Sequence, residues 1–499
     1  MSVDAVVVGG GANGLAAALM LARTGRSTVV LDARDAVGGL CAGAEFHPGY
    51  RHVGHLHDSD TVRPAVVDGL ALTGLAFAPR AAVGIGGPDG GLVFGDDPAT
   101  VSLGPAAEGF ARWRALCGRV APLVAELVDR PPPRIDAAAP LWPLAQRAIT
   151  ARRAGAALLQ ELMRRVPGSI EDALSDLLVD RRLRAGVALG GLHGTFMGPR
   201  SPQSAGILLL REALAGPSVV GGPAAFVAAL ASAATTRGVE LRPRSAVARI
   251  RVRGGAVVGV TLRDGTEIDA RIVVSALDPR ATLLGLVEGG ALPIALEEEA
   301  RAQRVRTTSA KLFLALSRAP KFCGRDGLRR FRVADDPDHL ERAFDDAKHG
   351  RMPGRPALDV VVPTLDDLSL APAGHHVASI DVFGVPAAPA GGWTQSAREQ
   401  LQSAVIALLA AHDPELPAAV VGAELVTAVD VAERYGVTGG HPMHGEHALD
   451  QLWFSRPGIG LAGHATPVKG LFLGSGGTHP HGWVGGASGW FAGRAAVEE

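Results

Sequence analysis

Short apolar runs separated by glycine-rich turns dominate both ends of this chain. Residues 6–8 are three consecutive valines, followed by a glycine-rich turn and then by small apolar residues at 15–22. β-Branched runs without polar alternation are typical of strands buried on both faces of a parallel sheet. A second run, at 28–31, ends at Asp32. The pattern predicts a strand, a turn, a helix ending near Gly25 and a second parallel strand.

The carboxyl-terminal end repeats this design. Residues 470–473 form a short apolar run that leads into a turn rich in glycine and histidine, and a helix is expected from about Gly486 onward. The chain therefore begins and ends with the order strand, glycine turn, helix.

The middle of the chain contains three segments with different patterns of predicted secondary structure. Residues 105–215 have helical periodicity with arginine-rich faces, and residues 239–274 have the β-branched runs and turns of hairpins. Residues 291–420 combine strand-like runs with one helix; the strands are expected at 311–316, 358–362 and 376–382, and the helix at about 396–411.

The first turn carries the pattern GxGxxG at Gly9, Gly11 and Gly14, and the carboxylate of Asp32 follows 21 residues after Gly11. Glycines at these positions permit a tight turn, close approach of backbone to a pyrophosphate, and close packing of helix on strand. The helix N-terminus offers unpaired N–H groups to phosphates, and the acidic residue can accept hydrogen bonds from ribose hydroxyls. A second match, at 458–463, lacks strand and helix context and is expected to be a loop.

Composition narrows the class of protein. The 499 residues carry 49 basic and 50 acidic side chains, and this balance argues against nucleic acid as a partner. The length allows about two to four domains. Three scattered cysteines indicate reduced thiols and a cytoplasmic protein. The uncharged stretch at 5–22 is divided by glycines and Asn13, so we expect no transmembrane segment.

Several segments together resemble one known family. The run VVVGGGANGLAAALMLARTGRSTVVLDARDAVGG, the segment VVSALDP at 273–279 and the ending GLFLGSGGTHPHGWVGGASGW are similar to the phytoene desaturase and phytoene dehydrogenase-related branch of the glutathione reductase-like flavoproteins. The amine oxidases and carotenoid isomerases are neighbours of this branch. The helical block offers no usable match.

The resemblance implies an α/β fold: a Rossmann-type FAD-binding domain of the glutathione reductase type with a discontinuous α+β substrate-binding domain. The FAD-binding domain would be built from three segments and the substrate domain from two. In chain order the expected segments are 1–75 (FAD), 76–214 (substrate, helical), 215–290 (FAD), 291–420 (substrate) and 421–499 (FAD).

The resemblance also implies FAD as the cofactor. Its ADP half would be held by the first glycine turn, the end of the second strand and a second glycine pair, and Val247 would contact the adenine through its backbone. The ribityl chain and the flavin ring would be held near the carboxyl terminus. The expected contacts are Gly9, Gly11, Ala12, Asn13, Gly14, Asp32, Ala33, Arg34, Gly38, Gly39, Val247, Gly474, Ser475, Gly476, Val484, Gly485, Gly486 and Ala487.

The implied activity is that of a dehydrogenase or desaturase. Hydride would leave an activated C–H of a largely apolar small molecule for the flavin, and a proton would leave the neighbouring atom, giving C=C or C=N. A redox-neutral isomerase, a flavin amine oxidase and a non-enzymatic flavoprotein are the alternatives. The substrate, the final electron acceptor and the oligomeric state stay open.

The ending departs from its relatives at His481 and Trp483, where small residues are common. These two side chains would narrow the pocket in front of the flavin, so a long polyene is not the expected substrate. His481, His479 and Trp483 are the candidate catalytic residues, with water or substrate as alternative bases. The alternative for His479 is a structural turn residue bonded to backbone.

Two further patterns concern metal binding and membrane contact. The histidine groups at 52–57 and 441–447 lack cysteine or carboxylate partners at ligand spacing, so no metal site is expected. Residues 141–166 contain five arginines and one glutamate around an apolar stripe. This segment is either a basic amphipathic helix at a membrane surface or a solvated face of a cap helix, so the predicted location is cytoplasmic with peripheral membrane contact as one interpretation.

Overall fold

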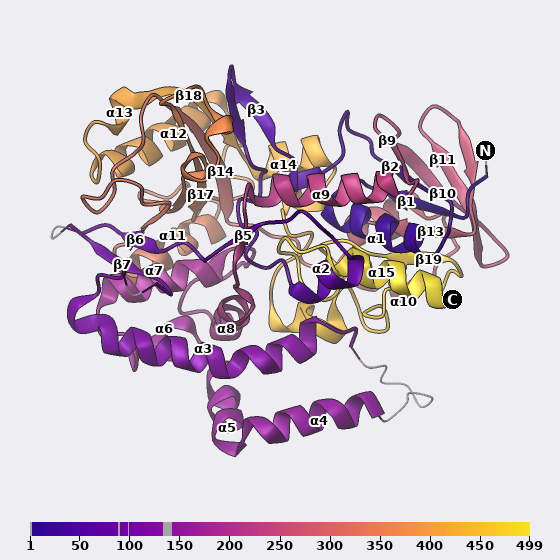
Figure 1. Cartoon of the computed structure of the whole chain (residues 1–499), viewed down its shortest axis with the longest axis horizontal. Helices are drawn as coiled ribbons and strands as arrows, with labels where there is room; N and C mark the ends of the chain where they lie inside the picture. The colour runs from indigo at the N-terminus through magenta and orange to yellow at the C-terminus, as the bar shows by residue number, and fades with distance from the viewer. Residues whose placement is uncertain (1, 88–89, 98, 133–141) are drawn as a thin grey trace.

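The computed structural model describes residues 2–87, 90–97, 99–132 and 142–499. Its amino and carboxyl termini lie at the same end of the molecule, which contains a parallel sheet (Figure 1). This sheet has five strands, all paired in parallel. In spatial order they are β19 (Leu471–Leu473), β13 (Ile272–Ser275), β1 (Ala5–Val8), β2 (Thr28–Leu31) and β9 (Glu240–Arg242).

Both faces of the parallel sheet are covered, which explains why its strands lack polar alternation. One face packs against α1 (Ala12–Arg23), α9 (Gly222–Thr236) and α15 (Ala487–Glu498), which lie side by side in Figure 1. The other face packs against an antiparallel sheet and α10 (Ile294–Ala302). That sheet consists of β10 (Val247–Arg253), β11 (Ala256–Leu262) and β12 (Glu267–Asp269).

A second large sheet has seven strands and is mainly antiparallel; only the β15–β6 pair is parallel. Helices α11 (Pro337–Lys348), α12 (Gln395–Ala410) and α13 (Leu416–Ala419) belong to the same part of the chain. In spatial order the strands are β18 (Val420–Val426), β14 (Ser309–Leu316), β17 (His376–Phe383), β16 (Ala357–Val361), β15 (Arg330–Val333), β6 (Val83–Ile85) and β7 (Leu92–Phe94).

A helical block packs beneath the seven-stranded sheet and shares a hydrophobic core with β6 and β7 (Figure 1). It contains α3 (Ala107–Val128), α4 (Trp142–Ala154), α5 (Ala156–Arg165), α6 (Ile170–Ser175), α7 (Arg181–Leu192) and α8 (Ser204–Leu214). Short elements complete the chain: α2 (Pro64–Leu70), α14 (Ala428–Tyr435), β3 (Ala44–His47), β4 (Tyr50–His52), β5 (Phe77–Ala78) and β8 (Ser218–Val219).

The basic segment predicted as one helix forms two. Gly155, with φ +86°, separates α4 from α5, because a backbone in the left-handed region cannot continue a right-handed helix. Residue 141, the first of that predicted segment, lies outside the described residues. Within the described part of the chain, no helix is long and apolar enough to span a bilayer.

The other predicted elements are confirmed, including the strands at both termini and those at 311–316, 358–362 and 376–382. The segment at 458–463 is a loop, as expected. The pattern did not reveal β15 and β18, and it missed α10 and α11, so residues 291–420 contain more than the one helix expected. Because β18 begins at Val420 and joins the seven-stranded sheet, the expected domain boundary at 420 falls at the start of a strand of that sheet.

The packing of α1 on β1 gives a stability prediction. A Cβ on Gly14 would lie 1.8 Å from the Gly9 carbonyl oxygen, whereas a Cβ on Gly118, inside α3, would meet no atom within 4 Å. We expect Gly14→Ala to lower the free energy of unfolding by about 2 kcal/mol or more, because the helix must move away from the turn. Gly118→Ala should raise it by about 0.5–1 kcal/mol. Chemical unfolding checks both, and equal stabilities would contradict the packing.

Candidate active site

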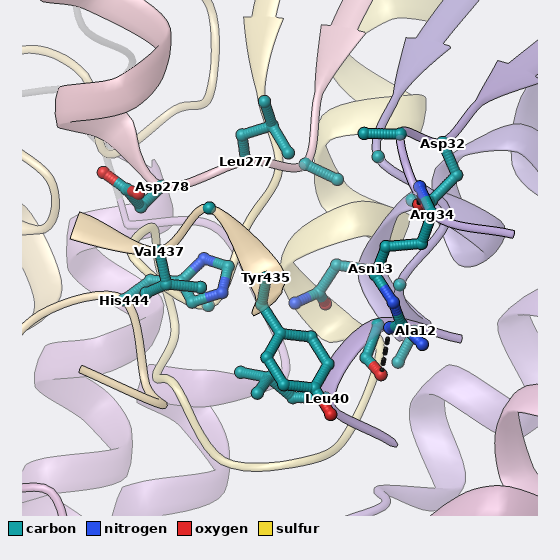
Figure 2. A pocket seen from close by; sticks show the side chains of 18 of the residues that line it. Ala12, Asn13, Asp32, Arg34, Leu40, Leu277, Asp278, Tyr435, Val437 and His444 are labelled. Atoms are coloured by element: carbon teal, nitrogen blue, oxygen red, sulfur yellow. Dashed lines mark hydrogen bonds between the residues drawn. The ribbon is translucent and has the colours of Figure 1, made fainter. Parts of the chain in front are cut away.

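A pocket of about 490 Å³ runs along the carboxyl ends of the parallel strands (Figure 2). Elements from both ends of the chain and from its middle line it. Of the predicted cofactor contacts, those in the lining are Gly9, Gly11, Ala12, Asn13, Gly14, Asp32, Ala33, Arg34, Gly38, Gly39, Val247, Gly476, Val484 and Gly485. Trp483 also lines it.

The first glycine turn is held in place by Asp32 and by the second glycine pair. The Gly10 N–H donates to Oδ2 of Asp32 (2.8 Å), and the Gly38 N–H donates to the Gly10 carbonyl (2.7 Å). Gly38 and Gly39 both have positive φ, +118° and +56°. A Cβ on Gly39 would lie 3.1 Å from the Gly11 Cα, so the glycine pair lets two backbone segments approach closely.

Gly11 differs from its neighbours because protein packing does not require glycine there. Its φ is −70°, and a Cβ on it would meet only the Gly39 Cα, at 3.9 Å. The vacant side of Gly11 belongs to the pocket. Gly11 is also the N-cap of α1, and no side chain caps that helix. The first N–H groups of α1 therefore remain free to bind a negatively charged group in the pocket.

Arg34 and Tyr435 together form part of the pocket wall (Figure 2). The Arg34 guanidinium donates to the Gly39 carbonyl (2.8 Å) and lies 4.7 Å from the centre of the Tyr435 ring. Tyr435 comes from the end of α14, and sequence reasoning gave it no role at this wall.

The carboxyl-terminal turn lies between β19 and α15. Gly476, Val484 and Gly485 line the pocket, whereas Gly474, Ser475, Gly486 and Ala487 do not. These four residues support the turn: Gly486 caps α15 with φ +68°, and the Ser475 hydroxyl accepts the Gly477 N–H (3.0 Å).

Arg456 fixes this turn through hydrogen bonds to backbone carbonyls. Its buried guanidinium donates to the carbonyls of Gly476 (2.6 Å) and Met443 (2.9 Å). Burial lowers the pKa of Arg456 to about 9. A buried guanidinium that binds carbonyls instead of a carboxylate fixes the backbone path of the turn.

The two candidate catalytic histidines lie outside the lining of the described cavities. Nε2 of His479 is 3.0 Å from the Arg130 carbonyl oxygen, the backbone contact that a structural turn residue would make. The His481 ring is buried against Trp483, with ring centres 5.3 Å apart. Burial, and then the charge of Arg456, lowers the pKa of His481 to about 3, so this ring is neutral near pH 7. A catalytic role for either histidine stays a prediction.

Two smaller cavities, each of about 40 Å³, lie next to the large pocket. Leu56 lines all three, and Trp483 and Val484 line both the large pocket and one of the small ones. We call these two small cavities the inner cavities. His193 and Asp381 line both of them, and the one next to Trp483 is also lined by His57, Asp58, Arg211 and Arg330.

A row of four charged residues crosses the seven-stranded sheet beneath the inner cavities. Lys311 pairs in register with Asp381, Asp381 with Asp359, and Asp359 with Arg332. The Lys311 ammonium lies 2.8 Å from Asp381, and Arg332 lies 3.0 Å from Asp359. Each of the two adjacent carboxylates therefore has a basic partner on its outer side.

The basic partners set the charge of these carboxylates. Burial alone would raise the pKa of Asp381, but the charges of His57 and Lys311 outweigh it and hold the pKa well below its usual range. Arg330 and Arg332 do the same for Asp359 against the effect of burial. Both carboxylates are ionised near pH 7.

His193 lies over the two carboxylates. Its Nε2 is 3.4 Å from Asp359 and its Nδ1 is 4.0 Å from Asp381. The side chain follows the end of α7 and is 14% exposed, and it lines both inner cavities. The His193 ring therefore lies between the inner cavities and the two carboxylates.

Sequence reasoning missed the residues of the inner cavities. His57 belongs to the histidine group at 52–57, which was considered only as a metal site, and His193 and Arg211 lie in the helical block, where no motif was recognised. The available signal was a charge inside an otherwise apolar strand, at Lys311, Asp359 and Asp381. In the residues that the structure describes, no group of three or more ligating side chains is arranged to hold a metal ion.

Comparisons with known proteins identify the class. A family described as FAD dependent oxidoreductase matches residues 4–340. Pyridine nucleotide-disulfide oxidoreductase domain-containing protein 2 of Rattus norvegicus is 29% identical over 97% of this chain and 92% of its own length. Hydroxyneurosporene desaturase of Cereibacter sphaeroides is 31% identical, covering 77% of this chain and 76% of its own. A putrescine oxidase structure superimposes with a TM-score of 0.61 at 16% identity, covering 100% of this chain and 99% of that one.

The chain therefore belongs to the FAD-dependent oxidoreductase family. The likeness to putrescine oxidase shows the shared fold. The inner cavities beside the large pocket are lined by charged side chains, whereas the sequence resemblance implies a largely apolar substrate, which stays a prediction.

The residues present fit FAD. Three features of the pocket agree with a dinucleotide: the vacant side of Gly11, the uncapped start of α1, and a volume within the range of about 300–1,000 Å³ usual for small-molecule sites. Asp32 accepts backbone N–H groups from Gly10 and Arg34, and a carboxylate keeps further lone pairs for ribose hydroxyls.

The contrast between Gly11 and Gly14 gives a direct test of the cofactor cradle. The Cβ of Gly11→Ala would extend into the pocket without a clash with other protein atoms, so we expect this variant to fold normally. Its affinity for FAD should fall by about 100-fold, equivalent to about 2.7 kcal/mol. Circular dichroism of the apoprotein and fluorescence titration with FAD measure the two effects. Wild-type FAD affinity would show that the cofactor does not approach Gly11.

Buried neutral histidines predict loss of stability in acid. Because the pKa of His481 is about 3 in the folded chain and about 6.5 when unfolded, the unfolded chain binds an extra proton between these values. Stability contributed by neutral His481 is present above about pH 6.5 and falls as the pH is lowered toward 3. Between pH 7 and pH 5, the free energy of unfolding should therefore fall by about 2 kcal/mol less in His481→Gln than in the wild type. Denaturant unfolding at saturating FAD measures this difference. Parallel pH profiles would contradict this.

Proposed function

We propose that this FAD-dependent oxidoreductase is a dehydrogenase that removes a hydride from a substrate carbon and a proton from the neighbouring atom, leaving C=C or C=N. When bound, FAD supplies the two-electron acceptor for such a reaction. The residues of this chain would bind and orient the substrate, limit the access of water and accept the proton.

The observation that carries the proposal is the position of His193. The ring borders both inner cavities, and one of them shares Trp483 and Val484 with the large pocket, so a molecule placed in that cavity would lie next to the predicted flavin segment. The Asp359 and Asp381 carboxylates lie 3.4 and 4.0 Å from the two ring nitrogens of His193, and these contacts would orient the ring. His193 therefore replaces His481 as our first candidate for the base.

The relatives support a C–H oxidation without fixing the substrate. The name of hydroxyneurosporene desaturase describes formation of a double bond, whereas putrescine oxidase is named for an amine. The fold alone connects this chain to the amine oxidase. A redox-neutral isomerase remains the second candidate, and the mass of the product separates the two: a dehydrogenase lowers it by two hydrogens.

The assignment of His193 predicts a kinetic phenotype. With a substrate that reduces the flavin, His193→Gln should slow flavin reduction by about 100-fold or more, because general-base catalysis commonly contributes 10²–10⁴. FAD content should remain at the wild-type level, because His193 does not line the large pocket. Stopped-flow absorbance measures the rate.

His481→Gln is the matched control, since it replaces a buried ring that lines none of the three cavities. It should slow flavin reduction far less than His193→Gln. The opposite order of effects would restore His481 as the base and remove His193 from the mechanism.

A further inference from the structure

Two side chains that line one inner cavity each have a buried hydrogen-bond donor that lacks an acceptor within the described part of the chain. The donors are Nη1 of Arg211 and Nε1 of Trp483. Arg211 is 6% exposed and Trp483 is 8% exposed. The two side chains are neighbours, because the guanidinium carbon lies 5.8 Å from the centre of the indole ring.

The chemistry of these groups limits what can bind to them. Guanidinium and indole N–H groups only donate hydrogen bonds, so their partner must be an acceptor. Leaving buried donors unpaired costs free energy, which an acceptor in the cavity would recover. Among acceptors, a carboxylate suits a guanidinium best, because the hydrogen bond is charge-assisted.

The acidic residues of the same cavity already have basic partners. Both oxygens of Asp58 accept hydrogen bonds from Arg330, at 2.8 and 3.1 Å, and Asp381 is paired with Lys311. Arg211 uses Nη2 for Asp60, at 2.8 Å, and has Nη1 left over. The group that still lacks a partner is thus an N–H donor of a basic side chain, and the carboxylates are already paired. This arrangement favours the binding of an anion over the binding of an amine.

We propose that this inner cavity is a carboxylate subsite, in which Arg211 and Trp483 bind the acid group of a small organic acid substrate. The cavity's volume of about 40 Å³ suits a group of that size, since one water occupies about 10–15 Å³ on the same measure. The carbon to be oxidised would then lie toward Trp483 and Val484, at the wall shared with the large pocket. The assignment of this acid as the substrate rests on the proposed dehydrogenase function.

Ligand binding to the FAD-loaded enzyme tests the subsite without requiring turnover. The probes are sodium propionate, propylammonium chloride and cyclopentene, which are small and are respectively anionic, cationic and apolar. Because Trp483 lines both cavities, an occupied subsite should change the flavin absorption spectrum. We expect a saturable change with propionate and weaker or no binding of the other two, with sodium chloride at equal ionic strength as the blank.

Variants then identify the donors. Trp483→Phe keeps an aromatic ring and removes the N–H, and Arg211→Lys keeps the charge and removes Nη1; each should weaken propionate binding by about 10-fold or more. Trp453→Phe is the matched control: the Trp453 indole N–H also lacks a partner among the described residues, but Trp453 lines none of the three cavities. This control should bind propionate as the wild type does. If Arg211→Lys fails to fold, Trp483→Phe still decides the question.

The proposal is overturned if propylammonium or cyclopentene binds more tightly than propionate, or if propionate binds Trp483→Phe and Trp453→Phe equally well. An effect reproduced by sodium chloride would identify an adventitious ion only and would also overturn it. Failure of the proposed function is distinguishable: propionate binding that depends on Trp483, in an enzyme whose substrates lose no hydrogen, refutes the dehydrogenase and leaves the subsite intact.

Discussion

The central physical constraint in this protein is the compensation of charges buried beneath the inner cavities. Asp359 and Asp381 face each other across neighbouring strands, an arrangement that is unfavourable unless opposite charges flank it. Lys311 on β14 and Arg332 on β15, the strands on either side of this pair, provide those charges. Removing either carboxylate would take a partner from a buried basic side chain, Lys311 or Arg332, which is strongly destabilising. The register of these four strands and the ionisation of the carboxylates therefore depend on each other.

The same cluster connects the two large parts of the structure. Arg330 on β15 binds Asp58, and Arg211 on α8 binds Asp60, in the segment that leads from the first glycine turn toward the helical block. Trp483 and Val484, from the other end of the chain, lie against this cluster and also against the large pocket. The fold thus places a small, charged cavity next to a glycine-lined cofactor cradle.

The cofactor region could be predicted from the sequence because its signals are local. A valine strand, a glycine turn and Asp32 lie within the first 32 residues, and each has a physical reason that holds regardless of the rest of the fold. The carboxyl-terminal turn was found for the same reason. Even so, Gly474, Ser475, Gly486 and Ala487 support that turn from outside the pocket, a distinction that spacing alone does not make.

The inner cavities could not be predicted because their residues meet only through tertiary structure. His193 ends a helix, Lys311 and Asp381 lie on strands 70 residues apart, and their contact depends on strand register. The sequence did contain a signal that we did not use: a single charged residue lies within each of three strand-like runs, at Lys311, Asp359 and Asp381. Helix periodicity likewise gave no sign of the break at Gly155 between α4 and α5.

The most direct test of this account is the position of the flavin ring in a crystal structure of the FAD-loaded enzyme. The account predicts that the reactive edge of the ring borders the wall formed by Trp483 and Val484, with His193 on the far side of the adjoining inner cavity. A ring bound in the large pocket but turned away from that wall, with its reactive edge open to another surface, would contradict the account.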